Sequence, residues 1–333
     1  MFNNKNILIT GGTGYFGKNF VKKIFKNYKP RRLIIFSRDE AKQYEMQNDK
    51  DFKKYLKQLR FFIGDVREKD RLTLAMINVD YVIHAAALKH VPSAEYNPTE
   101  CIKTNIYGAD NVIRSAIDCK VKKVLALSTD KAANPINIYG ATKLASDKLF
   151  IAANNLSGSK GPVFSVVRYG NVFGSRGSVV PFFKKLATDK KSFFPITDKK
   201  MTRFVITINE AINLVFKSFK MMKGGEIIVP KLPSMKITDL AKAIDKDKKT
   251  KIIGVRPGEK THEILCPSDD SRLTIEFKEH YIIIPSINFE INKKKFKRNN
   301  LKETGKFVNP NFEYNSGNNF KFLNTKELKN YLI

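Results

Sequence analysis

The chain has 333 residues, which is long enough for about two domains with a large apolar core. Its net charge of +29 is compatible with nucleic-acid binding, but the lysines are spread over most segments and no nucleic-acid-binding motif accompanies them. No apolar stretch approaches membrane-spanning length, and the 3 widely spaced cysteines predict neither a disulfide framework nor a metal site. We therefore expect a cytoplasmic protein, whose first strand begins too close to Met1 to leave room for a signal peptide.

The first segment predicts a dinucleotide site. An apolar strand at 6–10 is followed by Gly11, Gly14 and Gly17, and apolar residues then recur at helical spacing over 18–25. Gly11 allows a tight turn, Gly14 lets the backbone approach a pyrophosphate, and Gly17 lets the helix pack on the strand. The helix would then offer free backbone amides to the phosphates.

The end of the second strand distinguishes NAD from NADP. A carboxylate at this place would bond the ribose 2′-hydroxyl and repel a 2′-phosphate. The strand at 32–36 ends instead in Ser37 and Arg38, a hydroxyl and a guanidinium that suit a phosphate. Asp39 follows at once and Lys42 soon after, and the balance favours NADP as the cofactor.

The following segments alternate between strand and helix, which predicts an α/β fold with a Rossmann-type doubly wound parallel sheet. Further strands are expected at 60–66, 81–87, 124–128, 164–169 and 226–229. Asp65 is placed to meet the adenine amino group, and the small residues at 85–87 let the cofactor lie against the backbone. Beyond Gly170 the pattern becomes irregular and indicates a smaller C-terminal substrate-binding lobe. The predicted division is an NADP-binding domain at 1–169, its sheet completed by 204–229, and a lobe formed by 170–203 and 230–333.

The strand at 124–128 leads into the residues that indicate the chemistry. Thr129, Asp130 and Lys131 lie at its carboxyl end, where open α/β sheets place their reacting groups. Tyr139 and Lys143 are four apart and share one helix face. A phenol is a poor base at pH 7, but a neighbouring ammonium and a bound nicotinamide cation favour the phenolate. Such a phenolate can take a proton from a sugar hydroxyl while hydride leaves the same carbon.

Several motifs together resemble the extended short-chain dehydrogenases/reductases, and within them the C5-inverting UDP-N-acetylglucosamine 4,6-dehydratases of pseudaminic acid biosynthesis. They lie at 9–14, 84–92, 128–135, 139–143, 256–260 and 262–263. The lysine-rich stretch at 51–55 departs from the family but lies far from any motif. The resemblance implies NADP as cofactor, UDP-N-acetylglucosamine as substrate, and a homo-oligomer, either dimer or hexamer. It also implies a place in flagellin glycosylation.

The resemblance implies oxidation at C4, loss of water across C5 and C6, and return of hydride to C6. Tyr139, assisted by Lys143 and Thr129, would oxidise C4. Related retaining enzymes carry Glu where this chain has Lys131, so we expect Lys131 to be the C5 base and Asp130 the acid for the leaving hydroxyl. This role requires the pKa of Lys131 to fall by about three units, and a protonated Asp130 would remove the charge that opposes the fall.

The residues predicted to contact ligands follow from the dinucleotide fold and the resemblance. The cofactor set is Gly11, Thr13, Gly14, Tyr15, Phe16, Gly17, Ser37, Arg38, Asp39, Lys42, Asp65, Val66, Ala85, Ala86, Ala87, Tyr139 and Lys143. The substrate set is Lys89, Asn171, Thr197, Arg203, Arg256 and Glu259. Arg203 and Arg256 are the strongest of these, because guanidinium groups bind phosphate oxygens in pairs.

Two other interpretations remain open. A retaining nucleotide-sugar 4,6-dehydratase or a 4-epimerase would use Tyr139 without an acid and base pair at Asp130 and Lys131. A non-catalytic dinucleotide-binding protein could use its positive charge to bind RNA. The presence of Thr129, Tyr139 and Lys143 argues against that second interpretation, and we expect no nucleic-acid partner and no membrane insertion.

Overall fold

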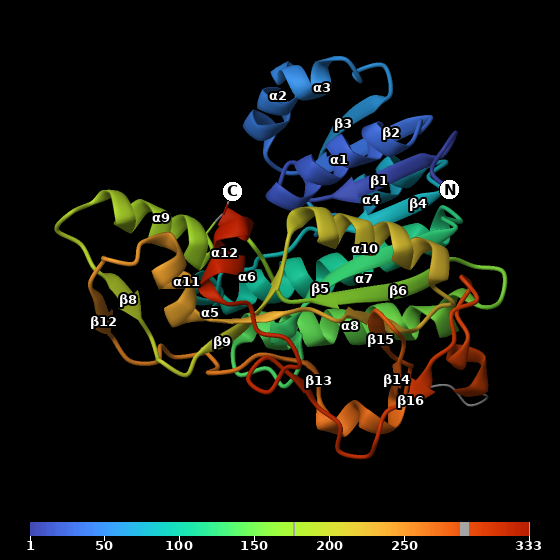
Figure 1. Cartoon of the computed structure of the whole chain (residues 1–333). Helices are drawn as coiled ribbons and strands as arrows, with labels where there is room; N and C mark the ends of the chain where they lie inside the picture. The colour runs from blue at the N-terminus through green and yellow to red at the C-terminus, as the bar shows by residue number, and fades with distance from the viewer. Residues whose placement is uncertain (176, 287–292, 333) are drawn as a thin grey trace.

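The computed structural model describes residues 1–175, 177–286 and 293–332, and one large sheet runs through most of them (Figure 1). The sheet has ten strands in the order β16-β14-β15-β10-β6-β5-β4-β1-β2-β3. Its strands in chain order are β1 (Asn6–Thr10), β2 (Arg32–Ser37), β3 (Leu59–Ile63), β4 (Tyr81–His84), β5 (Lys123–Thr129), β6 (Val163–Tyr169), β10 (Ile227–Pro230), β14 (Thr274–Glu276), β15 (His280–Ile283) and β16 (Lys306–Phe307). The strands from β10 to β3 pair in parallel, which confirms the predicted Rossmann-type fold.

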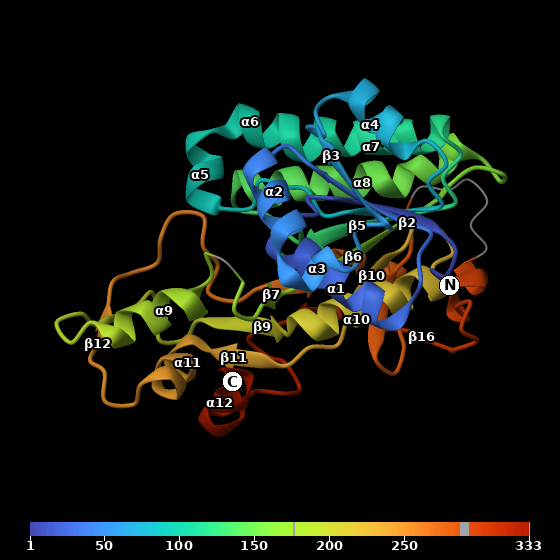
Figure 2. The same ribbon diagram turned by 90° about the horizontal axis from the view of Figure 1, so that it is seen from above.

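Helices cover both faces of this sheet, as a doubly wound fold requires (Figure 2). One face carries α1 (Tyr15–Asn27) and α10 (Ile208–Met221), and the other carries α4 (Lys69–Met76), α7 (Gly108–Asp118) and α8 (Ile138–Ser157). Because parallel strands are covered twice, the middles of β1 and β5 are runs of buried apolar residues, at 7–9 and 124–126. The remaining helices of this part are α2 (Glu40–Asn48), α3 (Lys50–Lys53), α5 (Val91–Tyr96), α6 (Pro98–Ile102) and a π-helix at Lys103–Tyr107.

A smaller unit extends to the left of the sheet in Figure 1. It contains the sheet β11-β9-β7, the pair β12-β8, and helices α9, α11 and α12. The pair β13-β17 instead packs on the core of the large sheet through Leu265, Cys266 and Tyr314. Their bounds are β7 (Asn171–Val172), α9 (Val179–Thr188), β8 (Phe194–Ile196), β9 (Thr202–Ile206), β11 (Ser234–Lys236), α11 (Ile237–Ile244), β12 (Thr250–Ile252), β13 (Ile264–Cys266), β17 (Tyr314–Asn315) and α12 (Thr325–Leu332). A separate apolar core, which includes Phe183, Phe194, Leu240 and Leu328, stabilises the outer part of this unit.

The strand ends differ from the sequence-based expectation. The third and fourth strands end at Ile63 and His84, so Asp65 and Ala85 lie in loops beyond the sheet. The loop after β4 turns toward the glycine turn that follows β1, where Ala86 lies beside Gly11, and no apolar pattern marks that departure from the sheet. The strands β14, β15 and β16 add antiparallel pairs next to β10, so the sheet extends beyond the segment 204–229 into the C-terminal part of the chain.

The lysine-rich stretch at 51–55 has a structural role beside α1. Phe52 is fully buried, and the ring of Tyr55 stacks on Phe25 with centroids 4.2 Å apart. Lys22 on α1 donates to Asp51 across 2.5 Å. This stretch therefore covers the outer side of α1 and lies away from the strand ends that bear the predicted catalytic residues.

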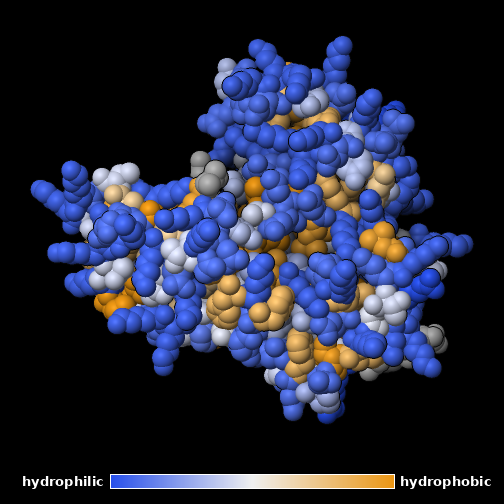
Figure 3. Space-filling view, in the orientation of Figure 1, coloured by the Kyte–Doolittle hydropathy of each residue, from blue (hydrophilic) through white to orange (hydrophobic). Residues whose placement is uncertain are grey.

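The molecular surface is mostly hydrophilic on the face seen in Figure 3, as the high lysine content leads one to expect. None of the helices in the described part of the chain is long and apolar enough to cross a membrane.

Candidate active site

The predicted catalytic residues meet where β5 ends and α8 begins. A short 3-10 helix, Asp130–Ala132, follows β5 directly, and Asn137 caps the start of α8 by accepting from the Gly140 amide. A Cβ atom on Gly140 would lie 2.2 Å from the carbonyl oxygen of Lys131, so only glycine permits this close approach. The packing of these two turns places Tyr139 and Lys143, both buried on α8, beside the end of β5.

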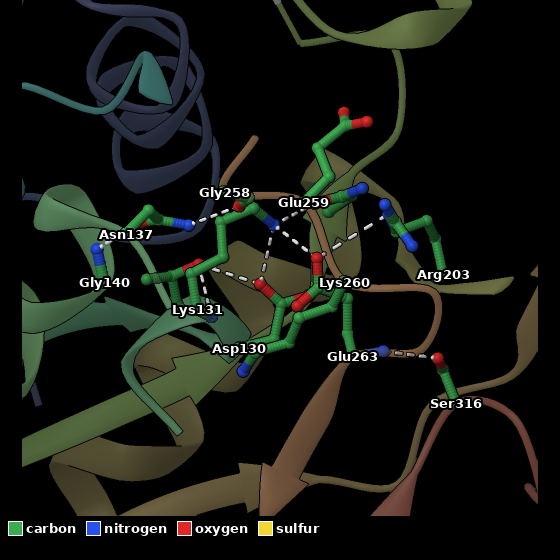
Figure 4. A network of polar contacts seen from close by, with 12 residues as sticks. Asp130, Lys131, Asn137, Gly140, Arg203, Gly258, Glu259, Lys260, Glu263 and Ser316 are labelled. Atoms are coloured by element: carbon green, nitrogen blue, oxygen red, sulfur yellow. Dashed lines mark hydrogen bonds and ion pairs between the residues drawn. The ribbon is translucent and has the colours of Figure 1, made fainter. Parts of the chain in front are cut away.

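Lys131 lies between two buried carboxylates (Figure 4). Its Nζ is 3.1 Å from Asp130 Oδ1 and 3.1 Å from Glu263 Oε1. The Nζ also lies 3.5 Å from Asn171 Oδ1, which brings a predicted substrate residue into the cluster. Arg203 Nε is 3.6 Å from the same Glu263 oxygen. The side chain of Asp130 is 0% exposed and that of Glu263 is 3% exposed, so these charges interact with little screening by water.

The pKa values of the three charged groups in this cluster shift in different directions. Burial raises the pKa of Asp130, and the charge of Glu263 adds to this rise against the opposing charge of Lys131. Burial would also raise the pKa of Glu263, but Lys131 and Arg203 outweigh it and lower that pKa. Burial would lower the pKa of Lys131, yet the two carboxylates raise it above its ordinary value. The expected direction for Asp130 is confirmed. The lower pKa that Lys131 needs to act as a base is not produced by the described residues, because Asp130 and the unanticipated Glu263 both raise that pKa.

Tyr139 is neutral at pH 7 in this state. Burial raises its pKa to about 12, against the opposing effects of the Lys131 charge and a hydrogen bond with Thr129. Lys143 donates from Nζ to the Leu127 carbonyl across 2.9 Å, and burial lowers the pKa of Lys143. The phenolate expected from the sequence includes the charge of a bound nicotinamide, so it stays a prediction about the protein with its cofactor. The charge of a bound cofactor is needed to favour the phenolate.

The glycine turn fits a dinucleotide phosphate group. Gly11 has a φ of +66°, and a Cβ atom there would lie 3.0 Å from Ala86 Cα. A Cβ atom on Gly17 would lie 2.3 Å from the Gly12 carbonyl oxygen, so α1 packs directly on the turn. Gly14 begins α1 without a side-chain cap, which leaves the first amides of the helix available to an anion.

The loop after β4 is fixed against this turn by one hydroxyl. Thr10 Oγ1 accepts from the amides of Ala85 and Ala86 at 3.1 and 3.2 Å. The predicted cofactor residues at 85–87 and those of the glycine turn therefore lie on one surface, at the carboxyl ends of adjacent strands. This arrangement fits the place where open α/β folds bind nucleotides.

The residues predicted to select NADP lie at the end of β2. Asp39 caps α2 by accepting from the Lys42 amide, and its carboxylate also pairs with the Lys42 ammonium. The Arg38 side chain is 57% exposed and lies 3.8 Å from Asp65 Oδ2. Asp65 is paired more closely with Arg67, at 2.7 Å, a partner that sequence reasoning did not include. The negative charge of Asp39 is thus balanced by Lys42 in the same turn, whereas the Arg38 guanidinium is accessible to a ligand.

The remaining cofactor candidates lie beside these elements. Thr13 and Ser37 are buried, and Gln43 Nε2 donates to Ser37 Oγ across 3.0 Å. Val66 packs against Gly108, where an added Cβ atom would lie 2.7 Å from a Val66 methyl group. Tyr15 and Phe16 form the first turn of α1.

The predicted substrate residues are only partly brought together. Asn171 and Arg203 join the Lys131 cluster, and burial together with the Lys131 charge lowers the pKa of Lys89. Arg256 pairs with Glu259 in the loop 256–260, whose Gly258 carbonyl accepts from Asn137 at 2.8 Å. Thr197 is buried at the end of β8 in the smaller unit.

Arg203 does not have the environment of an exposed phosphate ligand. It is 7% exposed, its Nη1 donates to the carbonyls of Thr202 and Thr261, and its Nε faces Glu263. Two of its nitrogens are therefore engaged inside the protein.

Sequence reasoning missed Glu263 and Lys260 as members of the site. Lys260 donates to the Ala133 carbonyl across 2.6 Å, and its charge contributes to the lowered pKa of Glu263. Lys260 lies in the motif at 256–260 and Glu263 in the motif at 262–263. Both motifs carried the resemblance to the family, but neither residue was predicted to be part of the site. Their distance from Lys131 along the chain gave no signal that they share its surroundings.

Comparison with known proteins agrees with this geometry. The family described as polysaccharide biosynthesis protein matches residues 7–285. A Campylobacter jejuni protein named UDP-N-acetylglucosamine 4,6-dehydratase (inverting) is 58% identical over 328 residues, which cover 98% of this chain and 97% of that protein. A Rickettsia bellii protein named UDP-glucose 4-epimerase is 40% identical over 340 residues, with coverage of 100% and 96%.

A solved structure shares the fold over nearly the whole chain. The X-ray structure of Pen from Bacillus thuringiensis is 37% identical with a TM-score of 0.87, and the match covers 99% of this chain and 98% of that one. The family match and the extensive identity with the Campylobacter jejuni protein together show that the chain belongs to the polysaccharide biosynthesis protein family and is a relative of the inverting UDP-N-acetylglucosamine 4,6-dehydratases.

Proposed function

We propose that this chain is a hydro-lyase that converts UDP-N-acetylglucosamine to UDP-2-acetamido-2,6-dideoxy-β-L-arabino-hex-4-ulose with inversion at C5. The observation that carries the proposal is Lys131, which lies 3.1 Å from the buried Asp130 and close to the Tyr139 phenol at the carboxyl end of β5. An acid, an amine and a phenol at one place supply the groups for elimination next to an oxidised carbon. The 58% identity with the Campylobacter jejuni protein supports the substrate and the stereochemistry.

Tyr139 acts first, by removing the proton of the C4 hydroxyl. The hydrogen bond with Thr129 orients its phenol, and the positive charge of Lys131 favours the phenolate. Lys143 is fixed by the Leu127 carbonyl and lies on the same helix face as Tyr139. When bound, NADP would accept hydride from C4 and later return it to C6.

Lys131 and Asp130 then divide the elimination between them. The C4 ketone acidifies the C5 proton, which Lys131 removes, while Asp130 protonates the departing C6 hydroxyl. Lys131 must first release a proton to water, which its 23%-exposed side chain can reach, because the two carboxylates favour its ammonium form. The charge of Arg203 opposes the ammonium form, since like charges repel. A proton delivered to the other face of C5 completes the inversion.

The same proposal assigns the ligand-binding surfaces. The domain at 1–169, completed by 204–229, binds NADP. The segments 170–203 and 230–333 bind the sugar nucleotide through Asn171, Thr197, Arg203, Arg256 and Glu259, and Lys89 of the first domain joins them. The exposed Arg256 is the stronger candidate for the diphosphate, because its guanidinium is accessible on the loop. The protein acts in the cytoplasm as a homo-oligomer and supplies pseudaminic acid biosynthesis for flagellin glycosylation.

Preference for NADP over NAD depends on Arg38 in this proposal. Arg38→Ala should weaken NADP binding by about 10- to 100-fold, the worth of one charge-assisted contact with phosphate, and leave NAD binding unchanged. Isothermal titration with each cofactor measures both affinities. Arg32→Ala, at the opposite end of β2, is the matched control and should alter neither. Equal losses for both cofactors in the Arg38 variant would refute its role in selecting the 2′-phosphate.

A labelled substrate tests the reaction itself. Substrate with deuterium at C4 should give a product with that deuterium at C6, because the hydride stays in the site between the two steps. NMR of the product and the amount of NADP consumed provide the readout. Loss of the label to water, or consumption of one NADP for each product formed, would exclude the proposed reaction.

A 4-epimerase is the second candidate, favoured by the 40% identity with the Rickettsia bellii protein. An epimerase would return the hydride to C4, so the same labelled substrate would keep its deuterium at C4. The position of the label therefore separates the two candidates in one experiment. A retaining 4,6-dehydratase would move the label to C6 but preserve the configuration of C5.

A further inference from the structure

Glu263 is built into the site rigidly although the proposed reaction assigns it no step. It directly precedes β13, where its amide donates to Ser316 Oγ at 2.9 Å and its carbonyl accepts from the Ser316 amide at 2.8 Å. These two bonds fix the backbone on both sides of the residue. Its side chain is 3% exposed and points to Lys131 and Arg203 (Figure 4).

Glu263 and Asp130 share one ammonium. Asp130 Oδ1 and Glu263 Oε1 are both 3.1 Å from Lys131 Nζ. Asp130 Oδ2 and Glu263 Oε2 are buried and have no hydrogen-bond partner among the described residues. Two carboxylates this close in a buried site do not readily ionise together, so one of them retains a proton.

The surrounding charges determine which carboxylate is ionised. Glu263 faces Lys131, Arg203 and Lys260, all cations. Asp130 faces Lys131 as its main cation, together with the negative Glu263, the neutral Tyr139 and the Thr129 hydroxyl. Lys260 lies close enough to interact with both carboxylates. The larger number of cations around Glu263 favours its ionised form and leaves the proton on Asp130.

On the basis of the proposed function, we propose that Glu263 is a positioning residue that holds Lys131 in place and keeps Asp130 protonated, so that Asp130 serves as the acid for the leaving hydroxyl. Glu263 acts through its two neighbours and has no contact with the reacting carbons in this role. The inference predicts that removing only the charge of Glu263 changes the elimination step and leaves C4 oxidation largely intact.

The test is Glu263→Gln, which preserves shape and removes the negative charge. Without that charge, the pKa values of Asp130 and Lys131 both fall, so both limbs of the pH profile of kcat should move to lower pH, by about one unit or more. Turnover above the wild-type optimum should drop by about 10- to 100-fold. The rate at which bound NADPH absorbance appears should change by no more than about twofold, since Tyr139 keeps its environment except for one remote charge.

Matched variants separate this role from a structural one. Glu226→Gln changes another buried glutamate, located next to β10, and should leave the pH profile in place. Glu263→Asp retains the charge and should keep the profile closer to that of the wild type than Gln does. An unshifted profile in a folded Glu263→Gln protein would overturn the inference.

A measurement on the unaltered protein covers the case in which the Gln variant does not fold. The infrared difference spectrum between the wild type and Asp130→Asn at pH 7 should contain the band of a protonated carboxyl group, a subtraction that removes any contribution of the buried Glu226. A difference spectrum without that band contradicts the inference. A wild type that has the band but forms no 4-keto-6-deoxy product would instead refute the proposed function, so the two failures can be distinguished.

Discussion

Tyr139→Phe is expected to abolish C4 oxidation, with turnover reduced by a factor on the order of 100 to 10,000, the usual worth of a positioned acid or base. The variant removes one oxygen atom and keeps the ring, which is 8% exposed and packs with Ala94 and Cys101. The fold and both ligand sites should therefore persist. Without the phenol oxygen, the site lacks the group to which we assign removal of the C4 hydroxyl proton. Rapid mixing with substrate should produce neither a 4-keto species nor the absorbance of bound NADPH.

The control for this experiment is Tyr81→Phe, which changes a half-buried tyrosine at the other end of the parallel sheet, where β4 begins. It should oxidise the substrate at the wild-type rate. Normal turnover in the Tyr139 variant would remove this residue from the reaction. It would also remove the reason for grouping Thr129 and Lys143 with it.

Lys131→Ala should reduce turnover by a factor on the order of 100 to 10,000 while NADP and UDP-N-acetylglucosamine still bind. The amine that exchanges the C5 proton is lost, and the two carboxylates lose their shared cation. Because the Lys131 charge also favours the Tyr139 phenolate, oxidation of C4 should slow as well, though less than elimination. Titration calorimetry gives the affinities, and the accumulation of bound NADPH separates oxidation from elimination.

Lys148→Ala is the matched control, because Lys148 is an exposed lysine on α8. Its turnover should equal that of the wild type. A Lys131→Ala protein with undiminished turnover would show that the role assigned to Lys131 is wrong. Loss of cofactor binding together with activity would mean that the cluster around Lys131 supports the fold and not the chemistry.

The sequence predicted the parts of the site that depend on local order. Gly11, Gly14 and Gly17 follow a buried strand and begin a helix, so their geometry is determined by neighbouring residues. Tyr139 and Lys143 share a helix face because of their spacing. The parallel sheet followed from the alternation of strands and helices, which is confirmed for β1 to β6 and for β10.

The parts that were not predicted depend on contacts between distant segments. Glu263 reaches Lys131 because β13, which Glu263 directly precedes, lies against the short helix that follows β5. The charge of Glu263 adds to that of Asp130 in raising the Lys131 pKa, against the direction that a base requires. The inward orientation of Arg203 has the same origin, because its partners are Glu263 and the Thr261 carbonyl. Spacing along the chain contains no information about either contact.

The central claim is that Lys131 exchanges the C5 proton with inversion, and one NMR experiment tests it directly. The purified wild-type protein is incubated with UDP-N-acetylglucosamine in deuterated water, and the first product is examined before any spontaneous epimerisation. The account predicts deuterium at C5 and the L-arabino configuration. A product that retains the original configuration at C5 would contradict the account and assign the chain to the retaining dehydratases.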